Sequence, residues 1–277
     1  MLKVKTGAQK ERSIDYVESG AGPAVLFLPG SYSTTAAWRQ VQRHLNPGYR
    51  IVTTSLAGYG GTTDSRTLQD CGIEHEVHIV HELVRHIGQP VHLVGHSFGG
   101  TVALAVALSH TVDIASLSLF EANPIPLIRE HDGGRLYDET LRMSRAFEAA
   151  VNAGEQDAPA RVIDFWGGPG VFAAMPDAVK AYCRETAAVN VLDWRTVTSE
   201  VAARDCAALD IPVLLVRGGE ANPAMVAITE TLRACLPDVR YFAVDGAGHF
   251  LITSHAPRCA ELLSAFLDEA AARKNSP

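Results

Sequence analysis

Residues 91–100 read Val-His-Leu-Val-Gly-His-Ser-Phe-Gly-Gly, and a helical pattern follows through Ser109. This stretch sets Gly-x-Ser-x-Gly between an apolar run and a helix, the context of a nucleophilic serine at a sharp strand-to-helix turn. Such a turn needs neighbours almost without side chains, and Gly95 and Gly99 meet this need. A chance glycine-rich turn or phosphate loop is the alternative, but G-x-G-x-x-G and G-K-[ST] are both lacking here. The pattern therefore predicts that Ser97 stands at a sheet edge, beside a helix N-terminus.

The rest of the chain alternates between short apolar runs and longer helical patterns. Nearly continuous apolar runs are typical of strands buried on both faces of a parallel sheet. We expect such strands at residues 24–28, 50–55, 91–94, 116–120, 212–216 and 239–244, and an antiparallel edge hairpin at 13–19. We expect helices at residues 35–45, 74–87, 98–109, 224–235 and 257–271. The alternation predicts an α/β fold, a mostly parallel twisted sheet with helices on both faces.

The alternation stops between Phe120 and Ile211. Helical patterns there occupy residues 136–151, 159–165, 177–188 and 194–204. So much helix between two strands predicts an inserted helical cap over the C-terminal edge of the sheet, where open α/β sheets bind ligands. We expect residues 1–123 and 206–277 to form the core, and residues 124–205 to form the cap.

Three loops accompany the serine turn. Residues 26–31 read Leu-Phe-Leu-Pro-Gly-Ser, residues 56–60 read Leu-Ala-Gly-Tyr-Gly, and residues 246–250 read Gly-Ala-Gly-His-Phe. Together with the serine turn, these loops resemble those of the α/β-hydrolase family, over nearly the whole chain. A serine hydroxyl is a poor nucleophile without a base. His249 is the best candidate for that base, because it lies in a glycine-rich loop between an apolar strand and the last helix.

The catalytic acid is harder to place. In many members of the family it is an Asp after the strand that we expect at 212–216, where this chain has Asn222. A neutral amide cannot stabilise an imidazolium as a carboxylate does. The chain also has Glu121 directly after the strand at 116–120, an arrangement that resembles haloalkane dehalogenases. We expect Glu121 to be the acid, with Glu220 and Asp245 as the alternatives.

The resemblance also implies an oxyanion hole. It places one donor on the backbone N–H of Phe98, after the nucleophile, and the other on the N–H of Ser31. His96 adjoins Ser97, but the turn directs it elsewhere. We expect the substrate pocket to include Tyr32, His96, Trp166 and Phe250.

Composition excludes several classes of partner. The chain has 31 Asp and Glu against 24 Lys and Arg, a net charge of −7, which opposes binding to nucleic acid or to an anionic membrane. No apolar run is long enough to span a bilayer, and no signal-peptide pattern is visible. Five scattered cysteines without a C-x-x-C pair predict reduced thiols in a cytoplasmic protein. We expect a monomer or homodimer.

One group of residues has the types that bind metals. His75, His78 and Glu82 lie on the helix expected at 74–87, but on the polar side of its amphipathic pattern, which favours a solvated face. The expected triad needs no metal, since the protein supplies nucleophile, base and oxyanion donors. We therefore expect neither a metal nor an organic cofactor.

The sequence thus predicts a serine hydrolase that acts on a small, partly apolar carboxylic ester, thioester or lactone. Cleavage of a C–C bond, perhydrolysis or acyl transfer would use the same triad, and the fold does not choose among them. A non-catalytic ligand-binding receptor is the alternative from another class. Dehalogenase or epoxide hydrolase chemistry is excluded, because it needs a carboxylate nucleophile at position 97.

Overall fold

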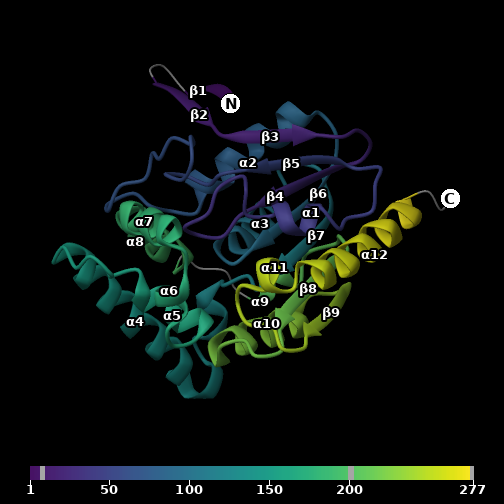
Figure 1. The fold of residues 1–277 in the computed structure, drawn as a ribbon. Helices are drawn as coiled ribbons and strands as arrows, with labels where there is room; N and C mark the ends of the chain where they lie inside the picture. Colours follow the sequence, from purple (N-terminus) through teal and green to yellow (C-terminus); the bar gives the residue numbers. More distant parts are fainter. Residues whose placement is uncertain (7–9, 199–202, 275–277) are drawn as a thin grey trace.

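The computed structural model describes residues 1–6, 10–198 and 203–274. Its centre is a seven-stranded sheet with the order β3-β5-β4-β6-β7-β8-β9 (Figure 1). Only β3 runs antiparallel to its neighbour. The strands are β3 (Tyr16–Ser19), β4 (Ala24–Leu28), β5 (Arg50–Thr54), β6 (Val91–His96), β7 (Ile114–Phe120), β8 (Val213–Gly218) and β9 (Val239–Val244). The prediction of a mostly parallel α/β sheet is confirmed.

Helices cover both faces of this sheet, and the strands alternate between two apolar clusters. Leu26 of β4 belongs to one cluster and its neighbour Phe27 to the other, since successive side chains of a strand point to opposite faces. The first face carries α2 (Glu74–Ile87), α3 (Phe98–Ser109) and α10 (Pro223–Cys235). The second carries α1 (Arg39–Gln42), α11 (Leu251–Ser254) and α12 (Ala256–Lys274).

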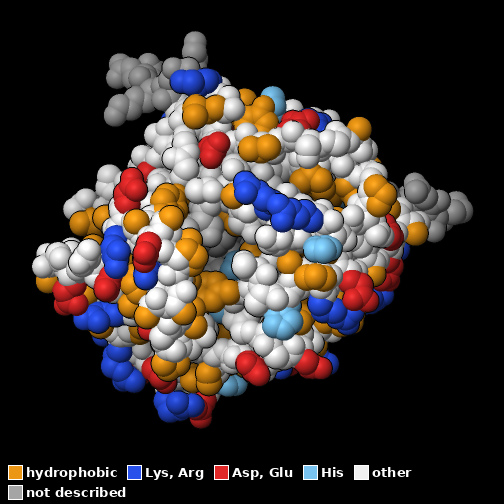
Figure 2. Space-filling view, in the orientation of Figure 1, with side chains coloured by type: hydrophobic (Ala, Val, Ile, Leu, Met, Phe, Trp, Pro, Cys, Tyr) orange, Lys and Arg blue, Asp and Glu red, His pale blue; other side chains and the backbone are white. Residues whose placement is uncertain are grey.

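A helical layer lies between β7 and β8 in the chain. It comprises η1 (Ile125–Ile128), η2 (His131–Gly134), α4 (Arg135–Asn152), α5 (Ala160–Gly167), α6 (Val171–Ala174), α7 (Asp177–Glu185), α8 (Ala187–Val197) and α9 (Ala203–Cys206). We call α4 to α8 the cap helices. They lie to one side of the sheet in Figure 1, and Figure 2 shows the molecule hollowed beside them, with hydrophobic side chains along the hollow. Within the described residues, no helix is both long and apolar enough to cross a membrane.

The structure corrects several expected boundaries. The helix expected at 35–45 is only the four residues of α1, because turns closed by i to i+3 hydrogen bonds flank it. The Trp38 indole, held at the Leu28 carbonyl, anchors this segment instead (3.0 Å). The two cap helices expected at 177–188 and 194–204 divide at Thr186, and residues 199–202 lie outside the described part. At the N-terminus, β1 (Leu2–Thr6) and β2 (Lys10–Ile14) form a separate antiparallel pair.

Candidate active site

Ser97 stands on the turn between β6 and α3. Its backbone has φ 52° and ψ −123°, a conformation that is unfavourable for a residue with a side chain and persists only where the surroundings impose it. The glycines around it are needed for space. A Cβ on Gly95 would collide with the backbone of Gly99, and one on Gly99 would collide with the carbonyl of Pro29. The close approach of strand, helix and neighbouring loop therefore fixes Ser97 at the sheet edge.

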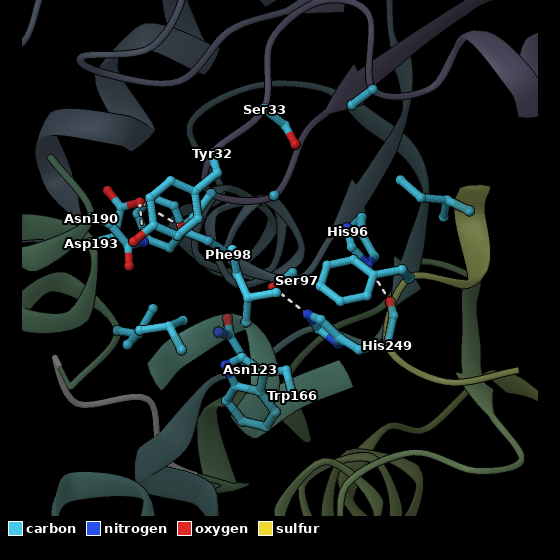
Figure 3. Close-up of a pocket in the computed structure, with 18 of the residues that line it drawn as sticks. Tyr32, Ser33, His96, Ser97, Phe98, Asn123, Trp166, Asn190, Asp193 and His249 are labelled. Carbon is cyan, nitrogen blue, oxygen red and sulfur yellow. Dashed lines mark hydrogen bonds between the residues drawn. The ribbon is translucent and has the colours of Figure 1, made fainter. Parts of the chain in front are cut away.

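His249 reaches Ser97 from the loop after β9. Its Nε2 lies 2.9 Å from Ser97 Oγ, and its Nδ1 lies 2.7 Å from Glu121 Oε2 (the Ser97 contact is drawn in Figure 3). An ionised carboxylate can only accept, so Nδ1 carries the proton and Nε2 is free to accept from the Ser97 hydroxyl. All three residues are buried. The structure thus brings the expected nucleophile, base and acid into one hydrogen-bonded chain.

Glu121 occupies its position through the backbone at the end of β7. Its φ of 49° is uncommon for a residue with a side chain and turns the carboxylate out of the strand. The second carboxylate oxygen, Oε1, accepts the backbone N–H of Gly218 at 2.6 Å. Both oxygens are therefore held, one by the neighbouring strand β8 and one by His249.

The alternative acids lie in different surroundings. Glu220 and Asp245 are exposed, whereas Glu121 is buried. Among the described residues, the Asn222 side chain makes no hydrogen bond to His249. Its side-chain oxygen Oδ1 caps α10 by accepting the N–H of Ala224 (2.8 Å), and its side-chain Nδ2 donates to the backbone carbonyl of Phe165 (2.7 Å). Position 222 therefore ties the helix after β8 to the cap.

His96 supports the loop that carries His249. Its Nε2 lies 2.8 Å from the carbonyl oxygen of His249, so this nitrogen carries the proton and donates. Burial, together with the nearby His249 ring, lowers the pKa of His96 to about 3. His96 therefore stays neutral at physiological pH. His96 lines the cavity, as expected of a pocket residue, and its hydrogen bond also supports the backbone of His249.

The loop after β4 runs beside Ser97. A Cβ on Gly30 would lie 3.1 Å from both His96 Nδ1 and Ser97 Cβ, so this loop passes very close to the nucleophile. Ser31 follows it, and the N–H groups of Ser31 and Phe98 have no acceptor among the described atoms. Tyr32 has φ 59° and fixes the loop in an unusual conformation.

A cavity of about 120 Å³ opens above Ser97, between sheet and cap. Trp166 of α5 stacks on the His249 imidazole at 5.5 Å between ring centres and on Trp194 of α8 at 6.1 Å. All four expected pocket residues line this cavity. Its lining comprises Gly30, Ser31, Tyr32, Ser33, Ala37, His96, Ser97, Phe98, Asn123, Val162, Ile163, Trp166, Asn190, Asp193, Trp194, Val197, His249, Phe250, Ile252 and Thr253.

The sequence reasoning missed a buried polar cluster at one end of the cavity, centred on Asp193 of α8. Asp193 Oδ2 accepts the hydroxyls of Ser31 (2.5 Å) and Tyr59 (2.6 Å). Asp193 Oδ1 accepts from Arg66 at 2.8 Å. Asn190 Nδ2 adds a longer bond of 3.3 Å to Oδ2. We call these five residues the Asp193 cluster; it joins the cap to the loop that carries Ser31.

Two further carboxylates adjoin Arg66. Glu76 of α2 lies 3.1 Å from its guanidinium and Asp64 lies 2.9 Å from it. Burial raises the pKa of Glu76 to about 7, although Arg66 opposes this shift. Burial alone would lower the pKa of Arg66, but the carboxylates raise it above its ordinary value. A sequence signal for this cluster did exist: Asn190 and Asp193 are spaced i, i+3 and are the only polar residues between Ala187 and Trp194.

Two of the three residues weighed as a metal site, His75 and Glu82, are engaged in other contacts. His75 hydrogen-bonds Ser65 Oγ at 2.8 Å and Asp70 at 3.0 Å. Glu82 pairs with Arg85. Across residues 1–6, 10–198 and 203–274, no group of three or more His, Cys, Asp or Glu side chains is arranged to hold a metal ion.

Proteins of known structure share this architecture. Solved structures with the same fold include a thermophilic esterase from Thermogutta terrifontis (TM-score 0.78, 19% identity, 97% of this chain and 98% of that one). Another is a bromoperoxidase from Bacillus anthracis (TM-score 0.77, 22% identity, 94% and 97%). At these identities the likeness concerns the fold alone.

Proteins with similar sequences include hydrolases of two kinds. A fluoroacetate dehalogenase from Burkholderia sp is 26% identical over 93% of this chain and 91% of its own length. The monoacylglycerol lipase abhd6-A from Xenopus laevis is 37% identical, but the match spans only 36% of this chain and 30% of the lipase. Residues 25–262 match the model of the alpha/beta hydrolase family. The resemblance seen in the serine turn and its three loops is therefore confirmed, and this chain belongs to the alpha/beta hydrolase family.

Proposed function

We propose that this protein is a serine hydrolase that cleaves a small carboxylic ester, or a thioester or lactone, with Ser97, His249 and Glu121 as its triad. The observation that carries the proposal is the continuous chain from Ser97 Oγ to His249 (2.9 Å) and from His249 to Glu121 (2.7 Å), at the floor of a cavity. Each separation lies within hydrogen-bond reach, as proton transfer to and from a base requires.

In acylation, Ser97 Oγ attacks the ester carbonyl carbon while His249 Nε2 takes the hydroxyl proton. The carbonyl oxygen becomes an oxyanion, which accepts from the backbone N–H groups of Ser31 and Phe98. The imidazolium is stabilised by Glu121 on one edge and by the face of Trp166, a ring that attracts cations. His249 then gives its proton to the leaving alcohol, and the acyl group remains on Ser97.

In deacylation, the same groups act on water. His249 Nε2 takes a proton from a water molecule, whose oxygen attacks the acyl carbon. The second tetrahedral intermediate collapses, its bond to Ser97 Oγ breaks, and the proton returns from His249 to Ser97. The products are a carboxylic acid and the free enzyme.

The relatives' names favour this reading without fixing the substrate. Esterase and lipase appear among them, and so does a dehalogenase. A dehalogenase of this fold needs a carboxylate where this chain has Ser97. Hydrolysis through an acyl-enzyme is therefore the better proposal for this chain.

A fluorophosphonate probe tests the activated serine directly. We expect the wild-type protein to be labelled at Ser97, and the Ser97→Ala and His249→Ala variants to remain unlabelled. A screen of p-nitrophenyl esters of increasing acyl length, beside thioesters and lactones, then tests the substrate class. A folded wild-type protein that neither reacts with the probe nor turns over any ester would favour a ligand-binding receptor and refute the proposal.

A further inference from the structure

Two residues that line the cavity each carry a buried polar atom without a hydrogen-bond partner among the described residues. The Tyr32 hydroxyl and Asn190 Oδ1 are inaccessible to solvent, and neither makes a hydrogen bond within the described residues. Both residues line the cavity above Ser97. An unpaired buried donor or acceptor costs about 1–3 kcal/mol, so a ligand that pairs with both gains by entering.

The Asp193 cluster explains why these two atoms are left over. Asp193 Oδ2 already accepts from Ser31, Tyr59 and Asn190, which leaves no place for the Tyr32 hydroxyl. The Asn190 amide is oriented by the same carboxylate. Its Nδ2 must face Asp193, since the reverse orientation would set its carbonyl oxygen against a negative charge, and Oδ1 therefore points elsewhere.

The two atoms complement each other chemically. Burial raises the pKa of Tyr32 well above its ordinary value, so its hydroxyl stays protonated and can donate. Asn190 Oδ1 can only accept. In Figure 3 the ring of Tyr32 extends toward Asn190 and Asp193. A single hydroxyl group can pair with both atoms. Its oxygen accepts a hydrogen bond from the Tyr32 hydroxyl, and its O–H donates a hydrogen bond to Asn190 Oδ1.

Charge at this end of the cavity disfavours an anionic group. Asp193, Asp64 and Glu76 all pair with the Arg66 guanidinium, and the described residues that line the cavity include no Lys or Arg. A substrate carboxylate would meet this excess of negative charge without a free cation, in a buried setting where such repulsion is poorly screened. A neutral hydroxyl meets no such penalty.

The position of the base decides which part of the ester carries the hydroxyl. Figure 3 places His249 on one side of Ser97 and Tyr32, Asn190 and Asp193 on the other. His249 protonates the leaving alcohol, so the leaving group lies on its side. The acyl group then extends toward Tyr32 and Asn190, into a cavity of about 120 Å³ that suits a short chain.

We propose that Tyr32 and Asn190 form a subsite for a neutral hydroxyl on a short acyl group, so that the substrate is a hydroxyacyl ester. This inference rests on the proposed ester hydrolysis. The test compares kcat/KM for phenyl butanoate with that for phenyl 2-hydroxybutanoate and phenyl 3-hydroxybutanoate. For each hydroxybutanoate ester, kcat/KM is divided by kcat/KM for phenyl butanoate. This ratio is then divided by the ratio of the two rate constants for hydrolysis by hydroxide, which corrects for the intrinsic reactivity of the esters.

We expect at least one corrected ratio to exceed about 10 in the wild-type protein, since sites built to bond a substrate hydroxyl discriminate strongly against analogues that lack it. Tyr32→Phe and Asn190→Leu should each bring that ratio to within about threefold of unity, the effect of losing one of two bonds. Tyr182→Phe is the matched control. Its hydroxyl accepts the N–H of Gly60 (3.1 Å) outside the cavity lining, so its ratio should equal that of the wild type.

The outcomes separate the two proposals. Hydrolysis of phenyl butanoate with corrected ratios near unity would overturn the hydroxyl subsite and leave the esterase proposal standing. A raised ratio that survives both substitutions would also overturn the subsite. Failure to hydrolyse any of the three esters would count against ester hydrolysis itself. The ratio is read within each variant, so a partial loss of folded protein does not change it.

Discussion

Two buried carboxylates, Glu121 behind His249 and Asp193 in the lining of the cavity, are held in different ways. Glu121 comes from the end of a sheet strand and faces His249 and the backbone N–H of Gly218. Asp193 comes from a cap helix and faces the side chains of Ser31, Tyr59 and Arg66. Glu121 therefore meets a group that can gain and lose a proton, whereas Asp193 meets a permanent cation. The difference fits the proposed roles, in which Glu121 orients His249 for the chemistry and Asp193 joins the cap to the core.

Removing the nucleophile should give the largest effect on the chemical side of this comparison. We expect Ser97→Ala to lower kcat by about 10⁶-fold, because no other group can form the acyl-enzyme. The free energy of unfolding should change by less than about 1 kcal/mol, since a single hydroxyl is lost at the cavity floor. Steady-state kinetics and urea unfolding measure the two quantities. Ser118→Ala, a buried serine on β7 outside the cavity lining, is the control and should retain full activity.

Neutralising Glu121 tests whether its charge acts through His249. We expect Glu121→Gln to lower kcat by about 10²–10⁴-fold, because the amide cannot stabilise the imidazolium. Glu220→Gln, which changes an exposed carboxylate, should cost less than about tenfold. If Glu220→Gln abolished activity while Glu121→Gln kept it, the acid would belong to the later loop.

Neutralising Asp193 should act on stability. We expect Asp193→Asn to lower the free energy of unfolding by about 3 kcal/mol, because Arg66 loses a buried counter-charge. Asp164→Asn is a matched control within the cap. Among the described residues, the Asp164 carboxylate accepts hydrogen bonds from the backbone N–H groups of Gly170 and Phe172 and pairs with no cation, so this substitution should cost about 1 kcal/mol. The free energies of unfolding are measured by urea unfolding. Equal losses in the two variants would show that the charge of Asp193 does not contribute more to stability than that of Asp164.

The smallest expected effect concerns the pH dependence of stability. Burial raises the pKa of Glu76 from 4.5 to about 7, so the folded state keeps this proton where the unfolded chain has lost it. The raised pKa of Glu76 contributes at most about 3 kcal/mol to the free energy of unfolding. This contribution is complete below about pH 4.5 and is lost as the pH rises to about 7. Glu76→Gln should flatten this decline. Unfolding at pH 5, 6, 7 and 8 measures it, with the exposed Glu74→Gln on the same helix as control; an unchanged slope in Glu76→Gln would contradict the assignment.

The fold and the Ser97 chain could be predicted because their signals are local. Gly95 and Gly99 flank Ser97 within one turn, and apolar runs mark the strands whose carboxyl ends must meet at one edge. Parallel strands leave few ways to place Glu121 and His249 except beside Ser97. The helix boundaries near Trp38 and Thr186 were less predictable, because tertiary contacts such as the Trp38 bond to Leu28 decide where these segments turn.

The sequence by itself thus determined the α/β architecture and the residues that converge on Ser97, since strand order and turn geometry follow from short-range patterns. Only the tertiary structure decided which residues meet at the polar end of the cavity. Asp193 meets Ser31 across 162 positions of the chain, and no local pattern predicts a pair so far apart. It likewise decided that Asn222 caps a helix and ties it to the cap. Side chains on separate elements acquire partners only when packing brings them together, and among the described residues this packing leaves the Tyr32 hydroxyl and Asn190 Oδ1 without a hydrogen-bond partner.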